Sequence, residues 1–77
     1  MPTKPLNELN PREKGKIVRV GGGGSIRRRF LDMGLVSGSE VEVERVAPLG
    51  DPIEVRIKGY HLTLRKDEAV NIKVEVI

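Results

Sequence analysis

The sequence predicts a mainly β fold, a small five-stranded barrel with one short helix after the first strand. Short segments in which apolar and polar residues alternate recur along the chain, which is typical of strands with one buried face. Turns rich in glycine and proline separate these segments, and no strand–helix–strand repeat indicates a parallel sheet. Because the chain has 77 residues, we expect one domain over residues 1–77 with a thin hydrophobic core.

The N-terminal part of the chain leads into the first strand. Residues 1–13 contain three prolines and are expected to be extended, with Leu6 and Leu9 as their anchors to the core. Residues 16–20, Lys-Ile-Val-Arg-Val, are predicted to form the first strand. The four consecutive glycines at 21–24 end this strand.

The helix is predicted to run from Ser25, its N-cap, to Gly34, which can adopt the positive φ that ends a helix. This boundary places Arg27 to Arg29 in the first turn, where the helix dipole disfavours cations by a few tenths to about 1 kcal/mol each. The segment therefore violates the usual placement of charges along a helix, as functional segments often do. Three apolar residues at i, i+4 and i+7 form a stripe that is predicted to cap the barrel, namely Ile26, Phe30 and Met33.

The second half of the chain alternates more regularly. Pairing Glu44 with Arg56 and Glu42 with Lys58 keeps the apolar residues of two strands on one face and opposes unlike charges. The predicted elements are strands at 40–46, 53–58, 60–64 and 70–76, a loop at 47–52 and one helical turn at 65–69. The predicted barrel lining is Val18, Val20, Val41, Val43, Val55, Ile57, Leu62, Leu64, Ile72 and Val74.

Catalysis and metal binding find little support among these residues. The chain has one histidine, His61, and no cysteine. No nucleophile with a neighbouring base is apparent, so no catalytic residue is assigned. A tight transition-metal site usually needs several His or Cys ligands. His61 with Asp67 and Glu68 is at most a weak surface site, and solvated carboxylates are the simpler interpretation, so we assign no metal ligand and no cofactor.

The charge is unevenly distributed along the chain. The net charge is +3, but residues 1–38 hold eight Lys/Arg against three Asp/Glu, whereas residues 39–77 hold six against eight. A basic face suits an acidic protein, a nucleic acid or lipid head groups, and a merely solvated surface is the simpler alternative. An aromatic content of 3% leaves no apparent stacking platform for bases. Because the first half of the chain is basic, a small basic nucleic-acid-binding barrel is nevertheless the alternative function.

The N-terminus lacks the apolar segment of a signal peptide, and no run reaches the roughly 18 apolar residues needed to span a bilayer. We therefore expect a cytoplasmic protein that is not inserted in the membrane.

Two motifs make the chain similar to a known family. Residues 29–35 read RFLDMGL at the end of the helix, and residues 47–52 read APLGDP in the loop between two strands. A Leu-x-x-Leu motif at 6–9 and a Gly-x-Ile-Val strand at 15–18 precede them. Together these motifs resemble the FeoA family over nearly the whole chain.

The resemblance implies an SH3-like β-barrel without enzymatic activity that serves bacterial ferrous-iron uptake. It also implies a partner, the cytosolic GTP-binding domain of the membrane protein FeoB, which the chain would bind and modulate. Family labels include transition-metal-ion binding, for which this sequence offers no convincing ligands. Nucleic acid is not an expected partner under this interpretation.

The helix and its exit form a candidate surface for such a partner. Leu31 lies about 140° around the helix from Ile26, off the apolar stripe, and an apolar centre with a cationic rim is typical of a protein-binding patch. The competing interpretation is that Leu31 and Leu35 seal the underside of the barrel. The predicted partner-binding residues are Arg27, Arg28, Arg29, Leu31, Leu35 and Val36.

Overall fold

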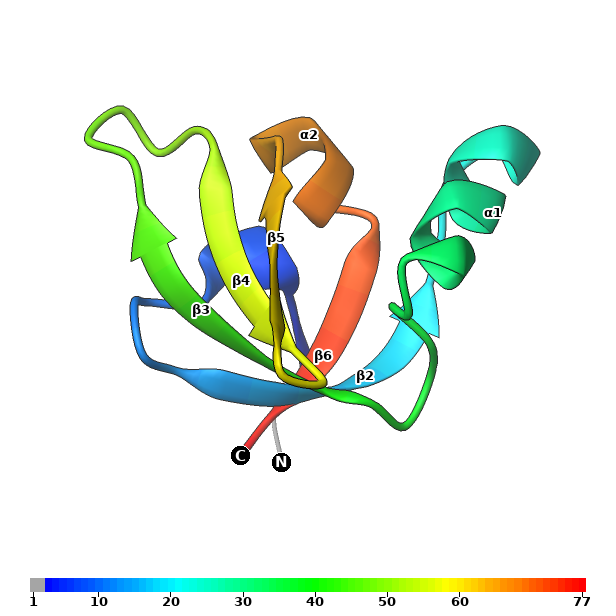
Figure 1. Ribbon diagram of the computed structural model, residues 1–77, viewed down its shortest axis with the longest axis horizontal. Coiled ribbons are helices and arrows are strands. Elements are labelled where there is room, and N and C mark those ends of the chain that lie inside the picture. Colours follow the sequence, from blue (N-terminus) through cyan, green and yellow to red (C-terminus); the bar gives the residue numbers. More distant parts are fainter. Residues whose placement is uncertain (1–2) are drawn as a thin grey trace.

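A computed structural model describes residues 3–77 and consists of one curved, six-stranded antiparallel sheet with short helices at its open side (Figure 1). The strand order is β1-β6-β2-β3-β4-β5. The predicted mainly β fold with one short helix is confirmed, but the sheet has six strands rather than five and the helix follows the second strand rather than the first. The elements are β1 (Thr3–Pro5), the 3-10 helix η1 (Leu6–Glu8), β2 (Lys14–Val20), α1 (Gly24–Asp32), β3 (Glu40–Val46), β4 (Ile53–Ile57), β5 (Tyr60–Leu64), α2 (Lys66–Ala69) and β6 (Ile72–Val76).

The sixth strand comes from the N-terminal lead-in, which the sequence indicated only as an extended segment. Lys4 of β1 lies opposite Val74 of β6, so the lead-in adds an edge strand to the sheet and α1 follows the second strand. The predicted anchors are confirmed, because Leu6 is 0% exposed and Leu9 is 4% exposed. No helix within residues 3–77 is long and apolar enough to cross a membrane.

A β-bulge in β2 changes which residues face the core. Ile17 lies opposite Val74, but the pairing shifts before Arg19. Because the bulge adds one residue, Ile17 and Val20 are both buried although they are three positions apart. Val18 is 44% exposed, so its predicted place in the barrel lining is wrong. Strict alternation cannot anticipate a bulge.

The register of β3 and β4 also differs from the predicted one. Glu42 lies opposite Arg56 rather than Lys58, a displacement of two residues, and a second bulge follows Val43. A shift of two residues leaves each side chain on its original face, so the predicted apolar face is confirmed. Glu44 still forms an ion pair with Arg56 as a diagonal neighbour, with a nitrogen–oxygen distance of 3.4 Å.

The remaining elements pack around one core. Backbone N–H of Lys66, at the start of α2, donates to Asp51 Oδ1 at 3.0 Å, which fixes the loop at 47–52 against α2. Of the three residues in the predicted helix stripe, Phe30 is fully buried and Met33 packs against the core, but Ile26 is 42% exposed. The core cluster is Leu6, Leu9, Ile17, Val20, Phe30, Leu35, Val41, Val43, Ile53, Val55, Ile57, Leu64, Ala69, Ile72 and Val74.

Candidate functional site

Helix α1 begins two residues earlier than the sequence indicated. Gly23 has extended backbone dihedral angles and is the N-cap, and its carbonyl accepts the first helical hydrogen bond from the Arg27 N–H at 2.8 Å. Arg27 and Arg28 therefore lie beyond the first turn, and Arg29 lies in the last turn, where the helix dipole favours a cation. The predicted electrostatic penalty at the helix start is wrong, because the glycines themselves form that start.

The C-terminal end of α1 is anchored in the core. Gly34 has φ +90°, and the N–H of Leu35 donates to the carbonyl of Phe30 at 3.0 Å, which is the Schellman arrangement. This turn brings Leu35 back against the core, where it is 0% exposed. Leu35 therefore seals the barrel, and its predicted place on the partner-binding surface is wrong.

Strand β5 holds the same end of the helix. The hydroxyl of Tyr60 donates to the carbonyl of Met33. A side-chain carbon added at Gly34 would lie 2.6 Å from that hydroxyl oxygen, so any larger residue there would have to displace Tyr60. The position of α1 is thus determined by its last turn.

One side of α1 faces the end of β2. The guanidinium Nε of Arg27 donates to the carbonyl of Val20 at 3.3 Å. Leu31, one turn after Arg27, is half-buried but does not belong to the core cluster, and the same holds for Val36. Val18 is exposed and lies beside the helix exit, because the Ser37 hydroxyl donates to the Val18 carbonyl oxygen at 3.5 Å. We call the surface formed by Val18, Arg27, Leu31 and Val36 the β2 flank.

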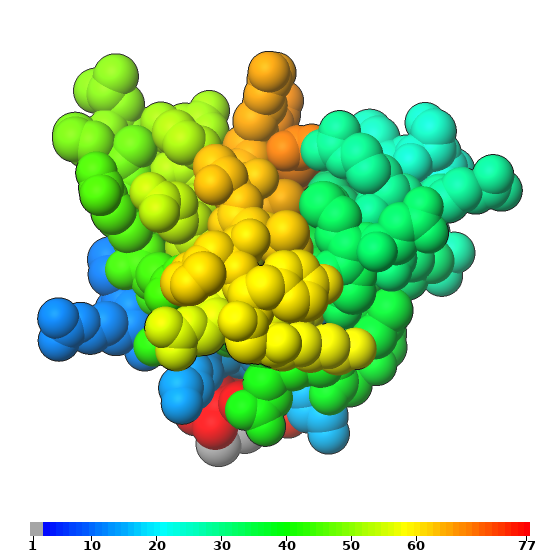
Figure 2. Space-filling model, in the orientation of Figure 1, coloured from blue at the N-terminus to red at the C-terminus, as the bar shows by residue number. Residues whose placement is uncertain are grey.

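The other side of α1 faces a groove along β5. Arg29 lies about 160° around the helix from Leu31, so the predicted residues do not form one continuous rim. Figure 2 shows the groove as a hollow between the orange surface of β5 and α2 and the teal surface of α1. Its volume is about 610 Å³, and we call it the β5 groove. It is lined by Ile26, Arg29, Pro52, Thr63, Arg65, Asp67 and Glu68.

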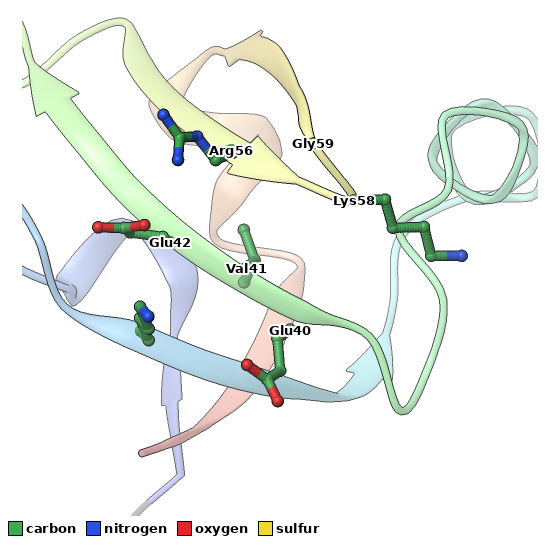
Figure 3. A pocket seen from close by; sticks show the side chains of 7 residues that line it. Glu40, Val41, Glu42, Arg56, Lys58 and Gly59 are labelled. Carbon is green, nitrogen blue, oxygen red and sulfur yellow. The ribbon is translucent and has the colours of Figure 1, made fainter.

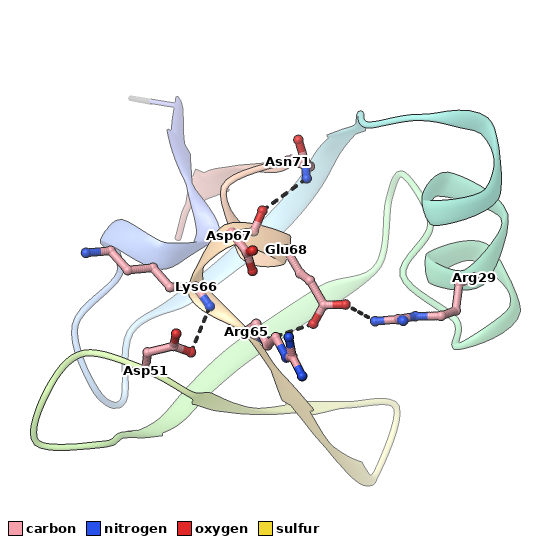
Figure 4. Close-up of polar contacts among 7 residues, drawn as sticks. All are labelled: Arg29, Asp51, Arg65, Lys66, Asp67, Glu68 and Asn71. Carbon is pink, nitrogen blue, oxygen red and sulfur yellow. Dashed lines mark hydrogen bonds and ion pairs between the residues drawn. The ribbon is translucent and has the colours of Figure 1, made fainter.

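An ion pair spans this groove between the two helices. Figure 4 shows Arg29 of α1 paired with Glu68 of α2, and the second carboxylate oxygen of Glu68 accepts the backbone N–H of Arg65 at 2.9 Å. Glu68 therefore serves both the start of α2 and the contact with α1. Arg65 itself forms no ion pair within residues 3–77.

A second, smaller hollow of about 230 Å³ lies on the outer face of the sheet (Figure 3). Acidic and basic side chains share its lining, including Glu40, Glu42 and Lys58, and no single ligand chemistry dominates. In the part of the chain that the structure describes, no three His, Cys, Asp or Glu side chains gather closely enough to hold a metal ion. His61 instead contacts Glu44 on this face.

The two aromatic side chains of the chain are both engaged. Phe30 is fully buried, and Tyr60 is 42% exposed with its hydroxyl bound to the helix end. They do not form the stacking surface that a single-stranded nucleic acid needs. Among residues 3–77, the nucleic-acid alternative therefore lacks an aromatic stacking surface.

Comparison with known proteins decides the family. The model of the FeoA domain matches residues 4–76. The chain belongs to the FeoA family. FeoA is a non-catalytic accessory domain of ferrous iron transport, so the expectations of family and of no enzymatic activity are confirmed.

The chain is similar to part of a much longer transporter. It is 44% identical over 72 residues to the Fe(2+) transport protein A/Fe(2+) transporter FeoB fusion protein of Porphyromonas gingivalis. The match covers 94% of this chain but 8% of the fusion protein. In that relative, a FeoA domain and FeoB are therefore joined in one polypeptide.

Solved structures confirm the SH3-like fold. The FeoA-like protein of Clostridium acetobutylicum superposes with a TM-score of 0.90 at 43% identity, covering 100% of this chain and 90% of that one. FeoA of Stenotrophomonas maltophilia, solved with zinc and described as an SH3 domain protein, superposes with a TM-score of 0.81 at 28% identity. That superposition covers 97% of this chain and 91% of the other.

Proposed function

We propose that this FeoA domain binds the cytosolic GTP-binding region of a FeoB transporter in the cytoplasm and modulates its activity in ferrous-iron uptake. The observation that carries the proposal is the Porphyromonas gingivalis relative, in which the homologous domain is fused to FeoB. A fusion holds two domains at a high effective concentration. We propose that the FeoA domain of this chain makes the same association through non-covalent contacts.

We place this association on the β2 flank and the arginines beside it. Leu31 and Val36 keep part of their apolar surface outside the core, and Val18 adds a further exposed side chain next to the helix exit. Arg27 and Arg28 border these residues along the helix. An apolar centre with arginine at its edge matches the composition of protein interfaces, in which arginine is enriched and other charged residues are depleted.

The test is capture of full-length FeoB, reconstituted in nanodiscs, by the immobilised chain. Leu31→Gln should abolish capture while leaving the circular dichroism spectrum and the melting temperature near those of the wild type. Leu49→Gln is the matched control, because Leu49 is 94% exposed in the loop between β3 and β4, away from α1 (Figure 1). A folded Leu31→Gln variant that captures FeoB as well as the wild type does would contradict this surface.

The arginines are expected to act chiefly on the association rate. Replacing Arg27 and Arg28 by alanine should slow association and weaken its dependence on salt, with a smaller effect on dissociation. Biolayer interferometry against the same nanodiscs at two salt concentrations separates the two rates. Equal loss at high and low salt would show that the arginines do not steer the encounter.

A further inference from the structure

The two edges of the sheet are built differently. The edge strand β1 comprises only Thr3–Pro5 and ends in a proline, which cannot donate a ladder hydrogen bond. Short edges and prolines are the usual means of preventing a further strand from pairing. The opposite edge strand, β5, has five residues, Tyr60–Leu64, and no proline. The fold thus blocks one edge and leaves the other capable of pairing.

The turn before β5 determines which backbone groups point outward. Only Lys58 and Gly59 connect β4 to β5, so Ile57 and Tyr60 form the bonded pair that closes the hairpin. Bonded and non-bonded pairs alternate along an antiparallel ladder, so Leu62 and Leu64 are also bonded to β4. The two remaining residues of β5, His61 and Thr63, direct their backbone N–H and C=O away from β4.

These outward groups have no backbone partner elsewhere. Among residues 3–77, no backbone hydrogen bond outside the strand ladders involves His61 or Thr63. The two residues present donors and acceptors two positions apart, a spacing that another extended backbone reproduces. Both side chains are exposed, so the core does not cover this part of the strand.

The β5 groove lies along this edge. Thr63 forms part of its lining, and Ile26 of α1, which is 42% exposed, lines the same groove with Pro52. The groove therefore combines an unpaired backbone edge with a small apolar surface. This combination is typical of sites that bind a peptide by strand addition, where backbone bonds give affinity and side-chain contacts give selectivity.

We propose that the β5 edge binds an extended segment of FeoB as an additional strand. Thr63 exchanges both of its backbone hydrogen bonds with this segment, and an apolar side chain of the segment packs against Ile26 and Pro52. The Arg29–Glu68 pair at the α2 end of the groove is solvent-exposed on the Arg29 side, with 58% of that side chain accessible, so it opens at little cost. The inference rests on the proposed association with FeoB.

Amide hydrogen exchange tests the pairing directly. In the free chain, the N–H groups of His61 and Thr63 should exchange rapidly, whereas those of Leu62 and Leu64, bonded to β4, should exchange slowly. Full-length FeoB in nanodiscs should slow exchange at Thr63 by at least about tenfold and leave Leu62 unchanged. Equal exchange at Thr63 with and without bound FeoB would overturn the inference.

A pair of variants separates the backbone from the side chain. Thr63→Pro removes the outward N–H, and because that group has no partner in the fold, the edge strand should tolerate the proline. Its affinity for the nanodiscs should fall by at least about tenfold, whereas Thr63→Ala, which keeps the N–H, should bind within about twofold of the wild type. Circular dichroism establishes that both variants are folded. If Thr63→Pro does not fold, the exchange experiment on the wild type decides.

The outcomes distinguish this inference from the proposed function. If the wild type and a folded Thr63→Pro variant bind FeoB equally, FeoB association stands and strand addition is overturned. If the wild type does not bind FeoB in nanodiscs, both are overturned. Loss of binding in Thr63→Pro but not in Thr63→Ala, with protection of the Thr63 amide, supports both.

Discussion

The two ends of helix α1 differ in how they are held. The C-terminal end is fixed by the buried Phe30, by the Schellman turn at Gly34 and by the hydrogen bond from Tyr60. The N-terminal end has no side-chain cap, and Ile26 on it is exposed. A nine-residue helix is marginal by itself. Its existence here therefore depends on the anchored end.

The two ends of α1 therefore contribute differently: the anchored end to stability, and the exposed end to recognition of a partner. Substitutions at the anchored end remove contacts with the core and should destabilise the fold. The exposed end and the two sides of the helix contribute few core contacts, so they are available to a partner at little cost in stability. The loss in free energy of unfolding caused by substitutions should therefore decline steeply from Phe30 back toward Gly24.

The largest effect is expected at Phe30. Phe30→Ala leaves a cavity in the core of a 77-residue chain and should lower the free energy of unfolding by roughly 3 to 5 kcal/mol, a large fraction of the total stability of a small domain. Ile26→Ala, four residues earlier and 42% exposed, is the control and should cost less than about 1 kcal/mol. Urea unfolding followed by circular dichroism measures both. Similar losses in the two variants would show that the two ends of α1 are equally anchored.

The sequence predicted the anchored end better than the exposed one. Phe30, Met33 and the stop at Gly34 followed from helical spacing and from the conformational freedom of glycine, both of which are local properties. Ser25 was predicted as N-cap because its side chain suits that position, yet the chain begins the helix at Gly24 after Gly23. With the C-terminal end fixed by tertiary contacts, a weak cap suffices.

The strand predictions divide in the same way, between local properties that were predicted and tertiary contacts that were not. Alternation predicted β3 with its correct bounds and the inward face of β4, because these depend on period two alone. It missed the bulge that exposes Val18, and it misplaced the register of Glu42, because bulges and pairing depend on the neighbouring strand. The groove beside Thr63 arises from three distant segments. No local signal in the sequence indicates it.

The next largest effect is expected at Leu35. Because Leu35 is fully buried, Leu35→Ala should lower the free energy of unfolding by about 2 to 5 kcal/mol. Leu31→Ala, which truncates the same side chain on the β2 flank, should cost less than about 1.5 kcal/mol, because Leu31 does not belong to the core cluster. Thermal and urea unfolding of the pair provide the measurement. A larger cost for Leu31→Ala would mean that Leu31, rather than Leu35, seals the barrel.

Gly34→Ala should have an intermediate effect. An alanine at φ +90° is strained by roughly 1 to 2 kcal/mol, and its Cβ would crowd the Tyr60 hydroxyl at 2.6 Å. Adding Tyr60→Phe removes the hydroxyl and should recover only the part of the loss that is due to crowding. Gly24→Ala is the matched control at the exposed end, because nothing lies within 4 Å of the added carbon. That control should be neutral or stabilising by up to about 1 kcal/mol, and a loss there as large as at Gly34 would contradict the comparison.

The smallest effect is expected at the ion pair that joins α1 to α2. Arg29 is 58% exposed and Glu68 is 19% exposed, so solvent screens much of their attraction, and the coupling energy should lie between about 0.2 and 1 kcal/mol. Glu68→Ala should cost more than Arg29→Ala, because Glu68 also accepts the backbone N–H of Arg65. A double-mutant cycle with Arg29→Ala and Glu68→Ala removes that second contribution and isolates the pair. Repeating the cycle at about 1 M salt, where the Debye length is about 3 Å, should weaken the coupling. Because Arg29 lies in the last turn of α1, a coupling above about 2 kcal/mol that persists in salt would mean that the pair, and not the burial of Phe30 alone, anchors that end of the helix.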